Sequence, residues 1–231
     1  MTAMKQDERM QAIVARVERH MPVEPIALDP ELSSADSFLK ILRVKCYNWR
    51  TPQLDKFNAL RFTVNFPSLD ALTMIFYPRP ALDAPIFLCF MLLTNRKTVF
   101  HLNAYTPFEE PDYQADWIAP LSETLERYPP FDVRDRYPDW MSRYRRDCTL
   151  YGLFMKDRLD DLNALIFDYL DIYLPKLAAA EDVTDPERLA RIRTFHENFR
   201  TDIRTRDKAQ GMMSKFIGKE RARRIFYEAT T

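Results

Sequence analysis

Glycine is scarce in this sequence, with only 3 glycines among 231 residues. Enzymes that hold phosphates on a glycine-rich loop need closely spaced glycines, because the ligand must approach the backbone closely. Neither the GxGxxG pattern nor the GxxxxGKS/T pattern is present. Nucleotide-dependent chemistry would therefore require another kind of site.

Cysteines and long apolar runs are also lacking. The three cysteines, Cys46, Cys89 and Cys148, are widely spaced and odd in number, and they match no zinc pattern and no disulfide framework. No apolar run approaches the roughly 20 residues of a membrane span, and the N-terminus lacks the apolar segment of a secretory signal. We therefore expect a reduced, cytoplasmic protein without a membrane partner or a metal site.

The formal net charge is zero, because 34 Lys and Arg balance 34 Asp and Glu. The charge is unevenly spread, however: residues 188–231 contain 12 basic and 5 acidic side chains. These residues form either solvated helix faces or a basic surface that attracts an acidic partner. Binding to nucleic acid is the least favoured interpretation, so no nucleic-acid partner is predicted.

Short apolar runs typical of strands fill the first half of the chain. The runs 71–77 and 86–93 are apolar throughout and flank a proline-framed loop, YPRPALDAPI. Such strands must be covered on both faces, by helices on one side and by helices or an apolar ligand on the other. The predicted strands are 38–47, 59–66, 71–77, 86–93 and 97–105, and their short connections favour a meandering antiparallel sheet.

The second half shows helical spacing of its apolar residues. Asp185-Pro186 opens one helix, because proline suits a first helical turn, and Gly218 breaks the last one. Helices are predicted at 4–20, 112–127, 158–179, from Asp185 onward, and at 207–228. Strands followed by helices favour the α+β class. We expect one domain over 1–231, with an N-terminal helix and link (1–35), the sheet (38–105) and a mainly helical part (112–228).

Several stretches, in order along the chain, together resemble one protein family, the ferredoxin-dependent bilin reductases. The stretches are CYNWRTPQLDKFN (46–58), FYPRPALDAPIF (76–87), LNAYTP followed by FEEP (102–111), LYGLFMKD (150–157) and RDKAQGMMSKFIGKE (206–220). Each is weak by itself, but their shared order and spacing make the resemblance specific.

The resemblance implies a fold and a reaction. Members of this family form a three-layer α/β/α sandwich that holds biliverdin between the sheet and the C-terminal helices. They bind no metal or flavin, receive single electrons from an external [2Fe-2S] ferredoxin, and supply protons to bilin radicals on the way to a phytobilin. No heptad or exposed apolar strip suggests an oligomer, so a monomer is expected.

The resemblance also indicates proton donors. The family carries a pocket-facing histidine or other polar group where this sequence has Thr73, and a pocket-facing aspartate where it has Phe90. Phenylalanine cannot donate a proton and can only pack against a tetrapyrrole. Asp207 matches the aspartate of the C-terminal helix and is the expected catalytic acid. The structural alternative for Asp207 is a helix N-cap.

Basic residues are expected to bind the two propionates of a bilin. Lys156 and Lys208 match basic positions of the family, and Arg206 is a weaker addition. Exposed lysines without a ligand are the alternative. Asn58 takes the place of a polar residue near the pocket entrance, where it would hydrogen-bond the substrate.

His101 and Asn103 alternate on the predicted strand 97–105 and would replace the missing acids if that face lines the pocket. Histidine titrates in a useful range for proton transfer, which makes His101 a second catalytic candidate. The alternative is a structural histidine in the core or at a sheet edge.

Three functions remain open from the sequence. The favoured one is ferredoxin-dependent reduction of biliverdin or a related linear tetrapyrrole. The second is a non-catalytic protein of the same fold that binds or carries a bilin, because Thr73 and Phe90 replace the usual donors. The third is a reductase whose pocket is adapted to a different substrate.

Overall fold

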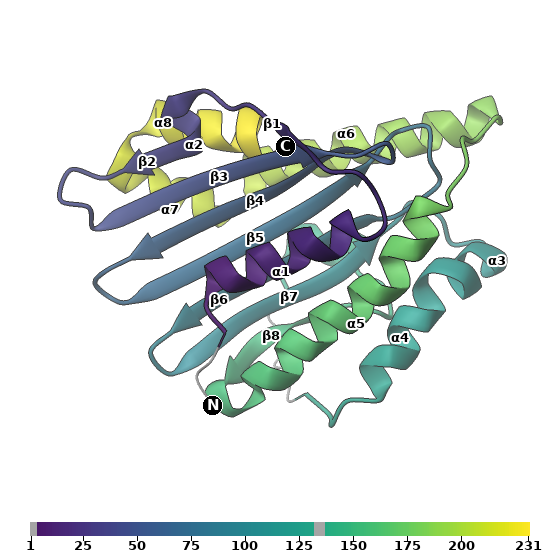
Figure 1. The fold of residues 1–231 in the computed structure, drawn as a ribbon, viewed down its shortest axis with the longest axis horizontal. Helices are drawn as coiled ribbons and strands as arrows, with labels where there is room; N and C mark the ends of the chain where they lie inside the picture. Colours follow the sequence, from purple (N-terminus) through teal and green to yellow (C-terminus); the bar gives the residue numbers. More distant parts are fainter. Residues whose placement is uncertain (1–3, 132–136) are drawn as a thin grey trace.

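One antiparallel sheet forms the centre of the molecule, as seen in a computed structural model that describes residues 4–131 and 137–231 (Figure 1). The strand order is β1-β3-β4-β5-β6-β7-β8, and β2 pairs with a second part of β3. Strands β3 to β7 are neighbours in chain order, so the sheet is the predicted meander. The strands are β1 (Glu24–Ile26), β2 (Ser34–Asp36), β3 (Leu42–Arg50), β4 (Leu54–Val64), β5 (Leu69–Pro78), β6 (Ile86–Thr94), β7 (Lys97–Tyr105) and β8 (Leu150–Met155).

Helices cover both faces of this sheet, which makes the three-layer α/β/α sandwich that was expected (Figure 1). One layer contains α1 (Gln6–Glu18), α3 (Pro111–Tyr113), α4 (Ala119–Glu126) and α5 (Leu159–Ala178), with a π-helical turn (Gln114–Ile118) between α3 and α4. The opposite layer contains α6 (Pro186–Arg206), α7 (Lys208–Ile217), α8 (Lys219–Arg224) and a π-helix (Ile225–Thr230). The short α2 (Pro30–Ser33) lies beside α8.

The unbroken apolar run of β6 is explained by this layering. Successive side chains of a strand point to opposite faces. Phe87 and Cys89 therefore belong to the core under α1 and α5, whereas Leu88 and Phe90 face the layer of C-terminal helices. Both faces of β6 are covered, so neither needs polar side chains.

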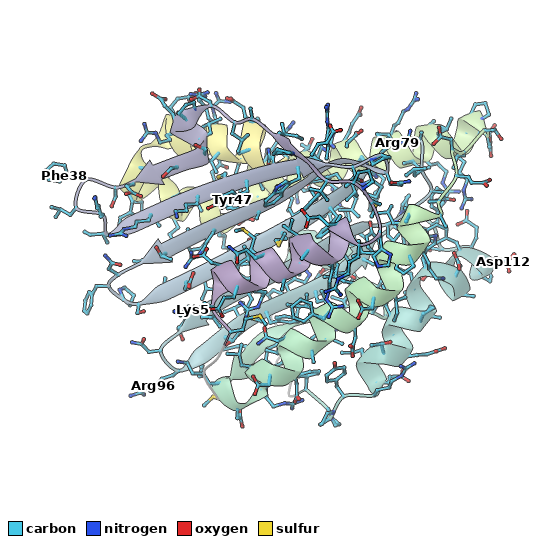
Figure 2. All side chains as sticks on the ribbon, in the orientation of Figure 1. Lys5, Phe38, Tyr47, Arg79, Arg96 and Asp112 are labelled. Atoms are coloured by element: carbon cyan, nitrogen blue, oxygen red, sulfur yellow. The ribbon has the colours of Figure 1, made fainter. Side chains whose placement is uncertain are left out.

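The predicted strands differ from the structure mainly at their ends. β3 begins at Leu42 because Phe38 to Ile41 form a turn, with Lys40 at a φ of 51°. Phe38 is 96% exposed and projects from the tip of this turn (Figure 2). Phe66, the last residue of the predicted strand 59–66, is 90% exposed beyond the end of β4. At the start of β3 and at the end of β4, the pattern of apolar residues extends beyond the residues that form the strand.

Three strands were missed by the sequence prediction. β1 and β2 lie within the segment predicted as an N-terminal helix and link, and β8 lies within the part predicted as mainly helical. β8 is only six residues long and follows a helix, so its pattern is weak. It matters for the site, because it extends the sheet beyond β7 and pairs Tyr151 with His101.

The ends of the C-terminal helices follow their predicted signals. Asp185 caps α6, where its carboxylate accepts a hydrogen bond from the N–H of Glu187 at 2.9 Å. Asp207 caps α7 in the same way through the N–H of Ala209 at 2.8 Å. Gly218 separates α7 from α8 at a φ of 87°, a conformation that favours glycine.

Candidate functional site

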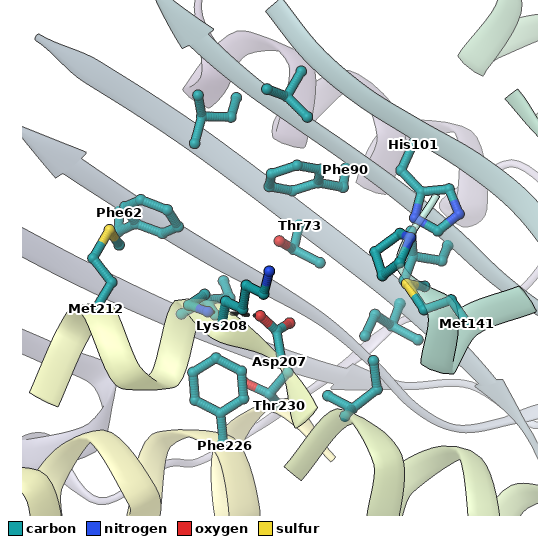
Figure 3. Close-up of a pocket in the computed structure, with 18 of the residues that line it drawn as sticks. Phe62, Thr73, Phe90, His101, Met141, Asp207, Lys208, Met212, Phe226 and Thr230 are labelled. Atoms are coloured by element: carbon teal, nitrogen blue, oxygen red, sulfur yellow. Dashed lines mark hydrogen bonds between the residues drawn. The ribbon is translucent and has the colours of Figure 1, made fainter. Parts of the chain in front are cut away.

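A cavity of about 480 Å³ lies between the sheet and the layer of C-terminal helices (Figure 3). Its floor is a row of side chains from five neighbouring strands. Residues directly opposed in an antiparallel pair point to the same face. The pairing register places Leu60, Thr73, Phe90, His101 and Tyr151 in one such row across β4 to β8.

The roof and side wall of the cavity come from distant parts of the chain. The start of α7 and the π-helix supply the roof, and residues around the 3-10 helix Asp139–Tyr144 supply a side wall. Most of these side chains are apolar or aromatic, as in pockets that bind flat organic ligands. They include Pro138, Trp140, Met141, Ile203, Met212 and Phe226.

Asp207 caps α7 and also lines the cavity, so the two alternatives left by the sequence are compatible with each other. Its Oδ1 caps α7, and its side chain lines the cavity opposite the sheet (Figure 3). Burial raises the pKa of the Asp207 carboxyl, and the hydrogen bond from Ala209 opposes that rise only in part. Among the described residues that line the cavity, Asp207 is the single carboxylic acid. A carboxyl with a raised pKa can donate a proton near neutral pH.

His101 lies in the cavity floor and is only 4% exposed. Its Nε2 is 3.1 Å from the hydroxyl of Tyr105 and 3.4 Å from that of Tyr137. Burial lowers the pKa of His101 to about 3, so the ring is neutral at physiological pH. The expectation that His101 titrates in the neutral range was therefore wrong, because burial disfavours the charged imidazolium. The partners of the buried ring are two tyrosine hydroxyls.

Thr73, Phe90 and Lys208 also line the cavity. Phe90 offers an aromatic face at the middle of the floor, and Thr73 offers the one aliphatic hydroxyl of that floor row. Lys208 reaches in from the first turn of α7, with its amine extended toward Thr73 (Figure 3). The cavity is therefore mainly apolar, and the Lys208 ammonium and the Asp207 carboxyl both reach it from the start of α7.

Four expected site residues do not line the cavity. Lys156 is exposed after β8, and Arg206 is exposed and paired with Asp202 at 3.1 Å. The side chain of Asn103 donates a hydrogen bond to the carbonyl of Tyr144 at 3.0 Å and accepts one from Thr149 at 2.9 Å. These contacts make Asn103 a buried structural amide that joins β7 to the loop before β8.

Asn58 is the fourth, and it is buried without lining the cavity. Its amide donates a hydrogen bond to the carbonyl of Thr230, one of the π-helix residues that line the cavity. Asn58 therefore supports the roof from the sheet side and does not face the entrance as predicted.

The tyrosines around His101 were missed by the sequence analysis. Tyr105 is four residues after His101 on β7, so strand alternation alone would have placed it on the same face. Tyr137 and Tyr151 come from segments with little periodic signal. The rings of Tyr137 and Tyr151 each pack edge-on against His101, at centroid distances of 5.4 and 5.2 Å.

Residues 4–131 and 137–231 contain neither a metal-binding cluster nor a helix that could cross a membrane. No group of three or more His, Cys, Asp or Glu side chains there could hold a metal ion. No helix in the same ranges is long and apolar enough to cross a membrane. The three cysteines are buried and unpaired, and burial raises the pKa of the Cys46 and Cys89 thiols to about 12.

The basic C-terminal quarter forms the outer surface of α6 to α8. Part of its charge is neutralised: Arg223 pairs with Glu220 at 2.7 Å, and Arg224 pairs with Asp29 at 2.9 Å. Lys215 on α7 and Lys219 on α8 are exposed. Two of these positive side chains therefore lie on the surface of the helical layer that also carries Asp207.

Comparison with known proteins gives matches over nearly the whole chain. A sequence model described as ferredoxin-dependent bilin reductase matches residues 10–229. Two proteins named 15,16-dihydrobiliverdin:ferredoxin oxidoreductase are similar to this chain. The one from Nostoc punctiforme is 26% identical over 89% of this chain and 84% of its own length. The one from Gloeobacter violaceus is 24% identical over 88% of this chain and 84% of its own length.

A solved structure supports the fold. Phytochromobilin synthase from tomato, crystallised in complex with biliverdin, superposes on this chain with a TM-score of 0.86. The match covers 95% of this chain and 80% of that protein, at 15% sequence identity. At this identity the likeness concerns the fold, and it confirms the expected sandwich.

Proposed function

The chain belongs to the ferredoxin-dependent bilin reductases, and from this we propose that it reduces biliverdin or a closely related linear tetrapyrrole to a phytobilin in the cavity beside Asp207. The observation that carries the proposal is the cavity itself. It is apolar, lies between the sheet and the C-terminal helices, and contains one carboxyl whose pKa is raised by burial. Such a carboxyl is suited to protonate a ligand that gains electrons.

The cavity residues take distinct roles in this proposal. The aromatic face of Phe90 and the side chain of Met212 would hold the tetrapyrrole from below and above. Lys208 would bind a propionate, because an ammonium on a flexible stem suits a mobile carboxylate. Asp207 would transfer a proton to the reduced substrate and regain one from solvent. Neutral His101 would hydrogen-bond a polar atom of the substrate.

Electrons would come one at a time from a [2Fe-2S] ferredoxin that docks on the outer surface of α7 and α8. Lys215 and Lys219 give this surface a positive charge, which would attract an acidic protein and accelerate its association. A donor docked there would lie on the outside of the helical layer that covers the cavity. We further propose that the protein works as a monomer in the cytoplasm, a location with which three unpaired cysteines agree.

The substrate is proposed more narrowly from the relatives. Two of them are named for 15,16-dihydrobiliverdin, and the tomato protein was crystallised with biliverdin. We therefore expect one of these two tetrapyrroles to be the substrate. The proposal would be tested by mixing the protein with each of them under anaerobic conditions and adding reduced ferredoxin with a regenerating system. A bound spectrum that passes through a radical to a shifted product would support it.

A second candidate is a non-catalytic bilin carrier. Phe90 and Thr73 favour it, because they leave the middle of the floor without an acid or a base. In that case either tetrapyrrole would bind with a changed absorption spectrum that stays fixed after reduced ferredoxin is added. Failure to bind both would instead indicate a cavity adapted to a different substrate.

A further inference from the structure

A pair of tyrosine hydroxyls contacts His101, and neither tyrosine is among the described residues that line the cavity. Tyr105 lies on the same strand and is fully buried, whereas Tyr137 is partly exposed. Both hydroxyls approach the same ring atom, Nε2, at 3.1 and 3.4 Å. The two hydroxyls also lie within hydrogen-bonding reach of each other. A connected line of exchangeable protons therefore runs from the partly exposed Tyr137 to the cavity floor.

The proposed reaction needs two protons, and a single acid that is not re-protonated can supply only one. Reduction of one double bond takes two electrons from two reduced ferredoxins and two protons. Asp207 enters from α7, in the helical layer, and His101 belongs to β7, in the sheet (Figure 3). The two groups therefore approach the cavity from opposite layers of the sandwich. A substrate between the layers is within reach of a different donor on each side.

We propose that Tyr137 and Tyr105 form a proton relay that ends at Nδ1 of His101 and delivers one of the two protons, while Asp207 delivers the other. This inference rests on the proposed reductase function. In the relay, Tyr105 donates its hydrogen bond to Nε2, which leaves the ring proton on Nδ1. Since Nε2 is engaged by the tyrosines, Nδ1 is the nitrogen that remains for the substrate.

The relay transfers a proton to the substrate without forming a charged intermediate in the protein. As the Nδ1 proton passes to the one-electron-reduced or two-electron-reduced substrate, Nε2 takes the proton of Tyr105. Tyr105 takes the proton of Tyr137, and Tyr137 takes one from solvent. The ring ends as the opposite neutral tautomer. It is reset after product release, when Nδ1 takes a proton from water in the emptied cavity while Nε2 returns its proton through Tyr105 and Tyr137 to solvent. Burial disfavours both an imidazolium at His101 and a phenolate at Tyr105, so concerted transfer is the route that remains.

The surroundings of the relay hold its geometry. Tyr151 packs edge-on against the rings of both His101 and Tyr137, each at a centroid distance of 5.2 Å. Tyr105 is held by edge-on contact with Tyr144 at 5.9 Å. Rings fixed in this way keep the hydroxyls directed at Nε2, which proton transfer requires.

The first test concerns the histidine tautomer in the protein without substrate. The nitrogen spectrum of protein labelled with 15N-histidine distinguishes protonated from unprotonated ring nitrogens, and His20→Gln and His196→Gln assign the three signals. We expect a proton on Nδ1 and a bare Nε2 at His101, the tautomer that free histidine disfavours. In the double variant Tyr105→Phe/Tyr137→Phe the proton should move to Nε2. A proton on Nε2 in the unchanged protein would overturn the relay.

The second test is single-turnover reduction of bound tetrapyrrole, followed by absorbance and electron paramagnetic resonance. The Tyr105→Phe/Tyr137→Phe variant should bind substrate normally but accumulate its radical, with decay slowed by about 100-fold. Tyr173→Phe is the matched control, because Tyr173 is equally buried on the other face of the sheet and donates to the carbonyl of Pro85. Its radical should decay at the original rate.

Two results would overturn the relay. The double variant could decay its radical as fast as the unchanged protein, or both variants could lose binding and stability together, which would assign the hydroxyls a structural role. Failure of the unchanged protein to reduce any tetrapyrrole would instead remove the proposed function, and the relay with it.

Discussion

Thr73 on β5 and Phe90 on β6 are directly opposed across the two strands, near the middle of the cavity floor. The pairing places a small hydroxyl and a large apolar ring where a tetrapyrrole would lie. The aspartate expected from the family resemblance at Phe90, and the histidine expected at Thr73, are absent, so any acid acting on the substrate must come from elsewhere in the cavity. Asp207, in the roof, is in a position to do so.

Restoring an acid at this pair should alter the reaction. In Phe90→Asp a carboxyl would enter the floor beside Thr73 and His101, and we expect a changed product spectrum because a second donor becomes available. The buried carboxyl should also lower the free energy of unfolding by about 1–3 kcal/mol, since it loses its hydration and replaces a well-packed apolar ring. Urea denaturation and product chromatography would measure the two effects. Phe90→Leu, which loses the ring without adding an acid, is the control, and equal product patterns in the two variants would refute the prediction.

Asp207→Asn should separate folding from catalysis. Asparagine caps helices as well as aspartate does, so α7 should form normally. It cannot donate a proton in the same way, so turnover should fall by about 100-fold while substrate binding changes little. Stopped-flow reduction and absorbance titration would measure these. Asp185→Asn is the matched control, because Asp185 caps α6 by the same contact. Full turnover in Asp207→Asn would remove Asp207 from the mechanism.

The same variant should change how stability depends on pH. Burial raises the pKa of Asp207 in the folded state above its unfolded value, so the folded protein holds this proton more tightly. The resulting stabilisation is present at low pH and is lost as the pH rises through the folded-state pKa. Asp207→Asn should therefore be more stable than the unchanged protein at pH 8, with a difference that shrinks as the pH falls. Thermal melts across the pH range would show it, and a difference independent of pH would contradict it.

Lys208 should contribute to substrate affinity and Lys156 should not. Lys208→Met keeps most of the side-chain length but removes the charge that would bind a propionate. We expect the dissociation constant to rise about 5- to 10-fold, the effect of losing one charged hydrogen bond near solvent. Lys156→Met should leave it unchanged, because Lys156 is exposed outside the cavity. Fluorescence or absorbance titration at two salt concentrations would compare them, and equal losses would restore the prediction made for Lys156 from the sequence.

Much of the fold could be predicted from local patterns. β5 and β6 are apolar on both faces, so their existence and pairing were clear from the sequence. The cap residues Asp185 and Asp207 and the break at Gly218 marked the helix ends correctly. Elements whose stability depends on distant partners were not visible. β8 is short and exists because β7 offers it an open edge.

The site could be predicted only in part, for a related reason. Residues on one strand or at one helix start were identified, because local spacing determines where they point. Asn103 shows the limit: it lies on the same face as His101, yet the loop before β8 takes up its hydrogen bonds. Tyr137 shows the converse, because nothing in its local sequence indicates that it reaches a histidine 36 positions away. Contacts between residues far apart in the sequence determine both the role of Asn103 and the position of Tyr137.

The capping contact of Asp207 has a stereochemical consequence. Oδ1 accepts the N–H of Ala209, so the carboxyl proton belongs on the other oxygen, Oδ2. A tetrapyrrole lying flat between sheet and helices would present one ring face to that oxygen. A proton delivered from α7 would then create only one of the two possible configurations at a reduced carbon. The handedness of the product would thus be determined by the residue at which a helix begins.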